Sequence, residues 1–221
     1  MSNDPGIRRH IPNALTISRL VLGVVFFAVM ARTQPSGVDG NGLGDRITTA
    51  FENDLGLLLA AAIFIIAAVT DAADGYLARK WQVVSRFGRV MDPFADKILV
   101  LGAFVMLAGT NFHAGLNDAG PSFPLTGVQP WMVVIILARE LLVTSLRGMI
   151  EGDGKDFSAT WSGKWKMILQ SVAVPAILLT IAFWTPLPDS TARRFIDVLV
   201  WLTVAVTVVS GVPYVRRAIA K

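Results

Sequence analysis

The sequence predicts an all-α integral membrane protein with six transmembrane helices and both termini on the cytoplasmic side. Hydrophobic residues make up 53% of the 221 residues and charged residues only 16%, which is too apolar for an ordinary soluble domain. The charged residues also avoid six long stretches, and about 20 apolar residues suffice for a helix to cross a bilayer. Lysine and arginine are spread unevenly over the segments between these stretches, which orients the chain.

The predicted spans follow one another along the whole chain. They are Ile11–Met30, Leu55–Ala78, Pro93–Gly109, Pro130–Met149, Met167–Trp184 and Phe195–Val212. The first resembles a signal peptide because Arg8 and Arg9 precede it. Its apolar part is long, however, it contains Arg19, and no clear small-x-small cleavage site follows, so we interpret it as retained. No internal repeat is evident, and residues 1–221 are interpreted as a single helical domain.

Most of the basic residues fall on one side of the predicted bundle. That side carries Arg8, Arg9, Arg79, Lys80, Arg86, Arg89, Arg147, Lys155, Lys164, Lys166, Arg216, Arg217 and Lys221. The other side carries only Arg32, Arg46, Arg193 and Arg194. Because basic segments stay in the cytoplasm, both termini are expected there, in a cell membrane protein. Residues 34–53 and 111–129 are then expected to face outward.

Residue types that are absent or rare restrict the possible chemistry. There is no cysteine, which excludes disulfides, thiolate catalysis and thiolate metal sites. The two histidines, His10 and His113, are isolated in the sequence. A bound metal is therefore expected to have mostly oxygen ligands, which favours Mg²⁺ or Mn²⁺ over zinc. No nucleic-acid partner is expected.

Four aspartates lie at the junction of the second and third predicted spans. The first pair shares a helical face with two small residues, and the second pair shares a face of the next helix. They are Asp71, Asp74, Gly75 and Ala78 on the first helix, and Asp92 and Asp96 on the second. Unpaired carboxylates are costly at membrane depth unless cations neutralise them. The pattern therefore predicts a site for two divalent ions.

An alternative is that these carboxylates cap helices and pair with the nearby basic residues Arg79, Lys80, Arg86 and Arg89. This suits Asp92, which precedes a proline and would be an N-cap with proline at the first helical position. It explains Asp71 and Asp74 poorly, because both continue the second predicted span. Asp74 also lies six residues before Lys80, or about 9 Å along a helix, so the site is expected at the depth of lipid headgroups.

This junction resembles the signature of the CDP-alcohol phosphotransferases at all eight signature positions. It reads Asp71-x-x-Asp74-Gly75-x-x-Ala78-Arg79, eight further residues, then Gly88-x-x-x-Asp92-x-x-x-Asp96. The resemblance implies that residues 1–221 form one membrane domain of this family. A CDP-linked lipid or alcohol then donates its phosphoryl-bearing group to an acceptor hydroxyl, and CMP leaves. It also implies a homodimer.

The resemblance implies a role for each signature residue. The metal ligands are Asp71, Asp74, Asp92 and Asp96, the last reaching the second metal and acting as the base for the acceptor hydroxyl. The nucleotide contacts are Gly75, Ala78, Arg79 and Gly88, and Ser85 is counted with them. The catalytic candidates are Asp92, Asp96 and Arg79. The stretch has no obvious covalent nucleophile apart from Ser85, so direct in-line displacement is the preferred mechanism.

The segment from His10 to Arg19 resembles a lead-in found in several bacterial members. Asn13, Thr16 and Arg19 are therefore candidates to reach the donor's nucleotide or diphosphate. An equally weighted alternative is a helix start, with Asn13 as the cap and Arg19 extending to the interface.

The acceptor is expected to bind basic residues of the fourth and fifth spans, which are Arg139, Arg147, Lys164 and Lys166. An arginine inside a span is a functional candidate, although pairing with Glu140 or a metal-site aspartate also explains Arg139. A basic cluster beside the membrane is otherwise a solvated face that sets topology.

Residues around these positions resemble the bacterial phosphatidylglycerophosphate synthases within the family. They are Ala138-Arg139-Glu140, Leu146-Arg147 and Gly163-Lys164-x-Lys166-x-x-x-Gln170, with Met167 where that branch usually has threonine. The resemblance implies transfer of a phosphatidyl group from the membrane lipid CDP-diacylglycerol to glycerol 3-phosphate. The alternatives are another acceptor, such as inositol phosphate or phosphatidylglycerol, and a membrane cation transporter.

Overall fold

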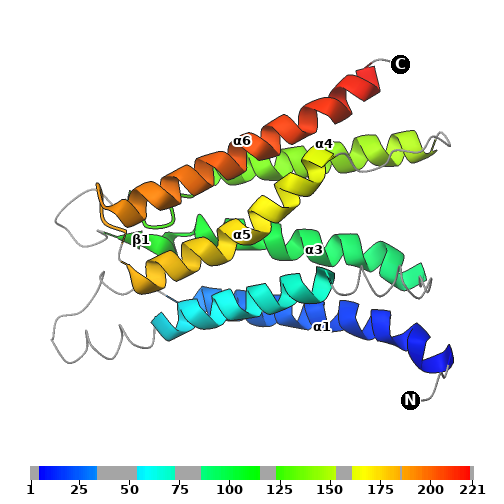
Figure 1. Cartoon of the computed structure of the whole chain (residues 1–221), viewed down its shortest axis with the longest axis horizontal. Helices are drawn as coiled ribbons and strands as arrows, with labels where there is room; N and C mark the ends of the chain where they lie inside the picture. Colours follow the sequence, from blue (N-terminus) through cyan, green and yellow to red (C-terminus); the bar gives the residue numbers. More distant parts are fainter. Residues whose placement is uncertain are drawn as a thin grey trace.

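The computed structural model describes residues 5–33, 54–72, 86–114, 123–152, 161–184 and 186–219, which are mostly helical (Figure 1). The long helices are α1 (Pro5–Arg32), the helix Asp54–Ala72, α3 (Arg86–Leu107), α4 (Pro130–Gly152), α5 (Trp161–Phe183) and α6 (Thr191–Ile219). A short 3₁₀ helix (Thr110–Phe112) and two antiparallel strands, β1 (His113–Ala114) and β2 (Phe123–Pro124), lie between α3 and α4.

Each predicted span corresponds to one of these helices, but two helices begin earlier than expected. α1 begins at Pro5 and α3 at Arg86, so Asn13 and Asp92 lie inside helices. The interpretation of either residue as an N-cap is therefore wrong. The basic residues before each predicted span are good helix formers and continue the helix, and a proline inside a membrane helix is tolerated. Residues 73–78 of the second predicted span lie outside the described residues.

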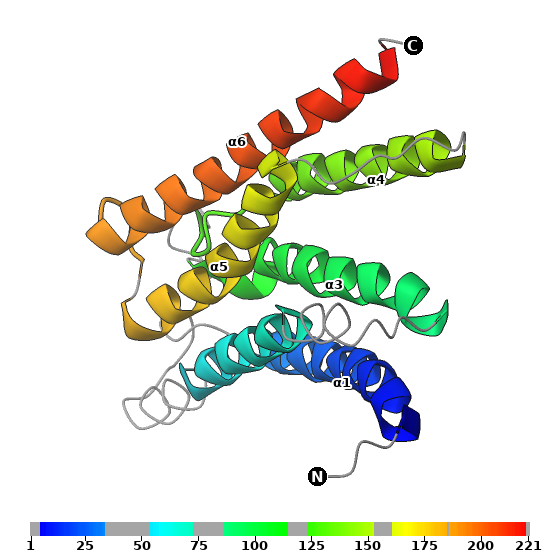
Figure 2. The same cartoon turned by 45° about the vertical axis from the view of Figure 1, so that its right-hand side comes forward.

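The long helices form one bundle in which successive helices run in opposite directions (Figures 1 and 2). Within it α1 packs against α3, and α6 packs against α4 and α5, with α5 inclined across the bundle. The start of α1 and the end of α6 lie at the same end, on the right in Figure 1. The position of the two termini relative to a membrane stays a prediction.

Small residues allow the helices to approach closely. A Cβ on Gly102 of α3 would lie 2.4 Å from Cζ of Phe27 on α1. A Cβ on Gly56 would likewise lie 2.5 Å from Oγ1 of Thr33, which follows α1. Both distances are far below van der Waals contact, so these glycines leave space for the side chains of Phe27 and Thr33, as small residues do in membrane bundles.

The apolar core fills one half of the bundle, and the buried charges lie toward the other half. In α1 the fully buried Phe26 and Met30 come after the buried Arg19. In α6, which runs the opposite way, the buried Ile196 comes before the buried Ser210. The core therefore lies away from the end that holds the start of α1 and the end of α6. The predicted site lies toward that end.

The outer faces of the helices are strongly apolar. Val24, Leu141, Val198 and Val209 are each more than 60% exposed. An apolar surface of this extent suits a lipid environment, in which backbone polar groups must be satisfied inside helices. Of the described residues, three helices are long and apolar enough to cross a membrane, namely Asp54–Ala72, Gly163–Phe183 and Thr191–Ile219. The chain is thus a helical membrane protein.

Candidate active site

Three charged side chains are buried among the described residues, and all three were candidate site residues. Arg19 of α1 is 2% exposed, Arg139 of α4 is 8% exposed and Lys166 of α5 is 7% exposed. Burying a charge without a partner costs several kcal/mol, so each must be compensated. Their partners define the polar half of the bundle.

Arg19 forms an ion pair with the first signature aspartate. Its Nη1 lies 2.6 Å from Oδ1 of Asp71, which joins α1 to the helix Asp54–Ala72. The Arg19 side chain is 1% exposed and that of Asp71 is 30% exposed. Arg19 therefore does not extend to the interface, and the structure places it beside the predicted metal site. Thr16, one turn earlier on α1, is also buried.

Glu140 of α4 is the centre of the second cluster. Its Oε2 accepts a hydrogen bond from Lys166 Nζ and lies 3.1 Å from Arg139 Nη1. Its Oε1 lies 3.9 Å from Nζ of Lys97 on α3, which donates a hydrogen bond of 2.6 Å to Thr144 Oγ1. One half-buried carboxylate thus joins cations from α3, α4 and α5.

Arg139 is also held from the side of α6. Its Nη2 donates a hydrogen bond of 2.9 Å to Ser210 Oγ, and its guanidinium lies 5.9 Å from the centre of the Tyr214 ring. Gly211 of α6 also packs beside it, since a Cβ there would lie 3.4 Å from Arg139 Cγ, at ordinary contact distance. Nε of Arg139 is buried and has no hydrogen-bond partner among the described residues. The guanidinium is therefore fixed but retains a donor.

The polar contacts continue one turn further along α5 and α6. Gln170 donates a hydrogen bond of 3.0 Å from Nε2 to Thr207 Oγ1, and both side chains are buried. Thr207 and Ser210 in turn donate to backbone carbonyls of α6. Buried polar networks of this kind fix the relative position of helices. The hydrogen bond between Gln170 and Thr207 thus fixes α5 against α6, one helical turn from the contact between Arg139 and Ser210.

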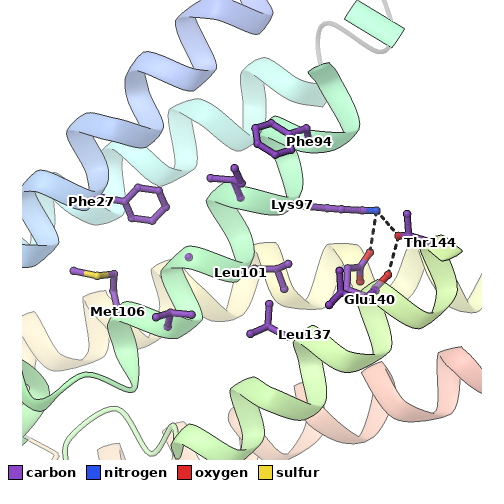
Figure 3. Close-up of a pocket in the computed structure, with 12 residues that line it drawn as sticks. Phe27, Phe94, Lys97, Leu101, Met106, Leu137, Glu140 and Thr144 are labelled. Atoms are coloured by element: carbon purple, nitrogen blue, oxygen red, sulfur yellow. Dashed lines mark hydrogen bonds and ion pairs between the residues drawn. The ribbon is translucent and has the colours of Figure 1, made fainter. Parts of the chain in front are cut away.

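An apolar groove of about 720 Å³ runs between α1, α3 and α4 (Figure 3). Phe27 and Leu137 are among its apolar walls, and its polar corner is formed by Lys97, Glu140 and Thr144. Arg139 and Lys166 do not line it. Glu140 thus stands between the groove and the buried cations.

The remaining candidates from the fourth and fifth spans are exposed. Lys164 lies at the start of α5, with Nζ 5.3 Å from the centre of the Trp161 ring. Arg147 is exposed near the end of α4. Arg139 and Lys166 are therefore brought together through Glu140, whereas Lys164 and Arg147 lie on the surface.

Most signature residues carry predictions that the structure does not test. Asp74, Gly75, Ala78, Arg79 and Ser85 lie outside the described residues. For Asn13, Gly88, Asp92 and Asp96 the structure describes the helical backbone alone.

The donor set suits a hard divalent cation, since it consists of carboxylates with no sulfur. Among these carboxylates, the structure describes only the side chain of Asp71. This residue is the first of the signature and lies in the last turn of the helix Asp54–Ala72. Within the described ranges no group of three or more potential ligand side chains occurs. The carboxylate of Asp71 and the residue types of the signature thus suit a divalent metal ion, and the geometry of the metal site stays a prediction.

Sequence reasoning considered Glu140 only as a partner of Arg139 and did not identify Lys97, Ser210 or Tyr214. Two signals pointed to them. Lys97 directly follows the last signature aspartate, and Ser210 and Tyr214 are one helical turn apart, at the end of the sixth predicted span and just beyond it. Their significance depends on which helices pack together.

Comparison with known proteins identifies relatives along almost the whole chain. The family model for CDP-alcohol phosphatidyltransferases matches residues 9–209. The chain is 34% identical over 210 residues to a CDP-diacylglycerol–glycerol-3-phosphate 3-phosphatidyltransferase of Bacillus subtilis, covering 94% of both chains. It is 32% identical over 211 residues to a probable phosphatidylglycerophosphate synthase of Mycobacterium tuberculosis, covering 95% of this chain and 82% of the relative.

Proposed function

The chain belongs to the CDP-alcohol phosphatidyltransferase family, and we propose that it transfers the phosphatidyl group of CDP-diacylglycerol to sn-glycerol 3-phosphate. The products are phosphatidylglycerophosphate and CMP. The relatives from two bacterial groups carry names for this activity and align along most of the chain. These names carry the choice of acceptor, and the buried pair Arg139 and Lys166 supports it, because a phosphate group bound away from water requires cationic partners.

The four signature aspartates are proposed to hold two divalent ions, Mg²⁺ or Mn²⁺. Such ions would supply positive charge for the diphosphate and for the transferred phosphorus. Arg19 supports this role, because its guanidinium contacts the Asp71 carboxylate and fixes its orientation. Thr16 and Asn13, on the same helix, are proposed to contact the donor's nucleotide or diphosphate.

The chain's own residues divide the remaining tasks. Arg79, with Gly75, Ala78, Ser85 and Gly88, is proposed to bind the cytidine nucleotide. Asp96 accepts the proton of the acceptor hydroxyl, whose oxygen then attacks the phosphorus in line as CMP leaves. Arg139 and Lys166 bind the acceptor's phosphate, with Arg147 and Lys164 at the entrance.

We further propose that residues 1–221 form one domain with six spans, in the cell membrane, with both termini and the active site at the cytoplasmic face. The opposite directions of successive helices and the shared end for the start of α1 and the end of α6 support this arrangement (Figures 1 and 2). Membrane lipid then reaches the site laterally. A homodimer is proposed from family resemblance.

The test is CMP release by the purified full chain with CDP-diacylglycerol and a panel of acceptors, with Mg²⁺, with Mn²⁺ and with a chelator. We expect metal-dependent CMP release with glycerol 3-phosphate and little with inositol phosphate or phosphatidylglycerol. A preference for either of those would replace the acceptor but keep the reaction class. No CMP release with any acceptor would contradict the enzyme function and would favour the alternative of a membrane cation transporter.

A further inference from the structure

We propose that Glu140 is a positioning residue of the acceptor site, which holds the ammonium group of Lys166 beside the guanidinium of Arg139 so that both bind one phosphate. The inference rests on the proposed function, since the phosphate is that of glycerol 3-phosphate. It adds a carboxylate to a site predicted to consist of cations alone.

The geometry shows how one carboxylate organises two cations. Lys166 Nζ and Arg139 Nη1 both contact the same atom, Oε2 of Glu140. Two like charges repel unless a shared counter-charge lies between them, and the repulsion is strongest where water is scarce. Because Arg139 and Lys166 are on different helices and both more than 90% buried, Glu140 is what allows their charged groups to lie adjacent.

The four described side chains of this cluster carry more positive than negative charge. Three cations, Lys97, Arg139 and Lys166, lie within 4 Å of Glu140, against its single carboxylate. Among these four side chains the net charge is therefore +2. A half-buried group of this kind is stabilised by a dianion, and phosphate matches both the charge and the donors of a guanidinium. The buried Nε donor of Arg139 shows that its hydrogen-bonding capacity is not used up within the described residues.

A purely structural ion pair is the competing explanation, and the contacts of Arg139 help to separate the two. The hydrogen bond of Arg139 to Ser210 and its contact with the Tyr214 ring do not involve Glu140. Arg139 therefore joins α4 to α6 through contacts that are separate from the carboxylate of Glu140. Loss of the Glu140 charge is expected to change the relative position of the two cations rather than unfold the bundle.

The experiment compares Glu140→Gln, which keeps the shape and removes the charge, with Glu140→Asp, which keeps the charge. The matched control is Asp197→Asn, which removes a carboxylate from the half-buried Arg193–Asp197 ion pair in the first turns of α6. We expect Glu140→Gln to raise KM for glycerol 3-phosphate at least about 10-fold, the effect of one charge-assisted hydrogen bond. KM for CDP-diacylglycerol stays within about twofold, Glu140→Asp recovers part of the loss, and the control changes neither KM.

Two further measurements keep the outcome decisive. Inorganic phosphate should compete with glycerol 3-phosphate, and its inhibition constant should rise in parallel with KM in Glu140→Gln. In a Lys166→Met background, Glu140→Gln should add little, because Glu140 acts through Lys166. An equal change of both KM values, or a fall in kcat alone, would overturn the positioning role.

The inference and the proposed function fail in different ways. If the wild-type chain does not use glycerol 3-phosphate, the proposed function is wrong. Thermal unfolding with inorganic phosphate then decides the inference. Stabilisation of the wild type but not of Glu140→Gln supports an anion site organised by Glu140, and equal stabilisation of both refutes it.

Discussion

The ion pair between Arg19 and Asp71 leads to an asymmetric prediction about stability. The Arg19 side chain is 1% exposed, whereas that of Asp71 is 30% exposed. Removing the carboxylate in Asp71→Asn takes a counter-charge away from a buried guanidinium, and breaking a buried ion pair from this side costs up to about 3–5 kcal/mol. Removing the guanidinium in Arg19→Met leaves a carboxylate that is partly exposed at the end of its helix, at a smaller cost of about 1 kcal/mol. The two halves of one ion pair are thus expected to differ in their contribution to stability.

The assay is thermal unfolding of the purified protein in detergent with a chelator present, so that metal binding does not contribute. For a chain of this size each kcal/mol lowers Tm by about 2–4 °C, so Asp71→Asn should lower Tm by about 6–20 °C and Arg19→Met by about 2–4 °C. The control is Asp189→Asn, at an exposed position with a φ of 65° that asparagine also adopts. An equal or larger loss in Arg19→Met would show that the buried charge is not the cause.

Three other predictions follow from the same arrangement. Cysteine introduced at Arg86 should react only with reagents that enter the cell, whereas cysteine at Val38 should react from outside, and the absence of native cysteine makes this labelling specific; labelling of position 86 from outside would invert the topology. Arg139→Ala should raise KM for glycerol 3-phosphate by about 10- to 150-fold, and Arg79→Ala should instead raise KM for the lipid donor, so a donor-only effect of Arg139→Ala would misplace the acceptor pocket. Gly102→Val should lower Tm by several degrees because its side chain meets the Phe27 ring, and an unchanged Tm would show that α1 and α3 separate freely.

Helix positions were largely predictable, and helix starts were not. A run of about 20 apolar residues is sufficient evidence for a membrane helix, because backbone groups in lipid must bond within the segment. The starts of α1 and α3 lie earlier than the capping residues suggested. Asn13 and Asp92 have the side chains of N-caps, but capping preference is worth only about 1 kcal/mol, and the flanking basic residues continue the helix.

The sequence by itself determined the helical membrane class, the reaction family and the candidate charged residues. Each depends on spacing within one segment, such as the i, i+4 separation of Asp92 and Asp96, and a helix converts that spacing directly into geometry. Only the tertiary structure decided which charges meet. Arg19 is 52 positions from Asp71, and Lys166 is 26 from Glu140, so both contacts exist only because particular helices pack side by side. Packing depends on side-chain volumes and close approaches from several helices at once, which no single segment encodes.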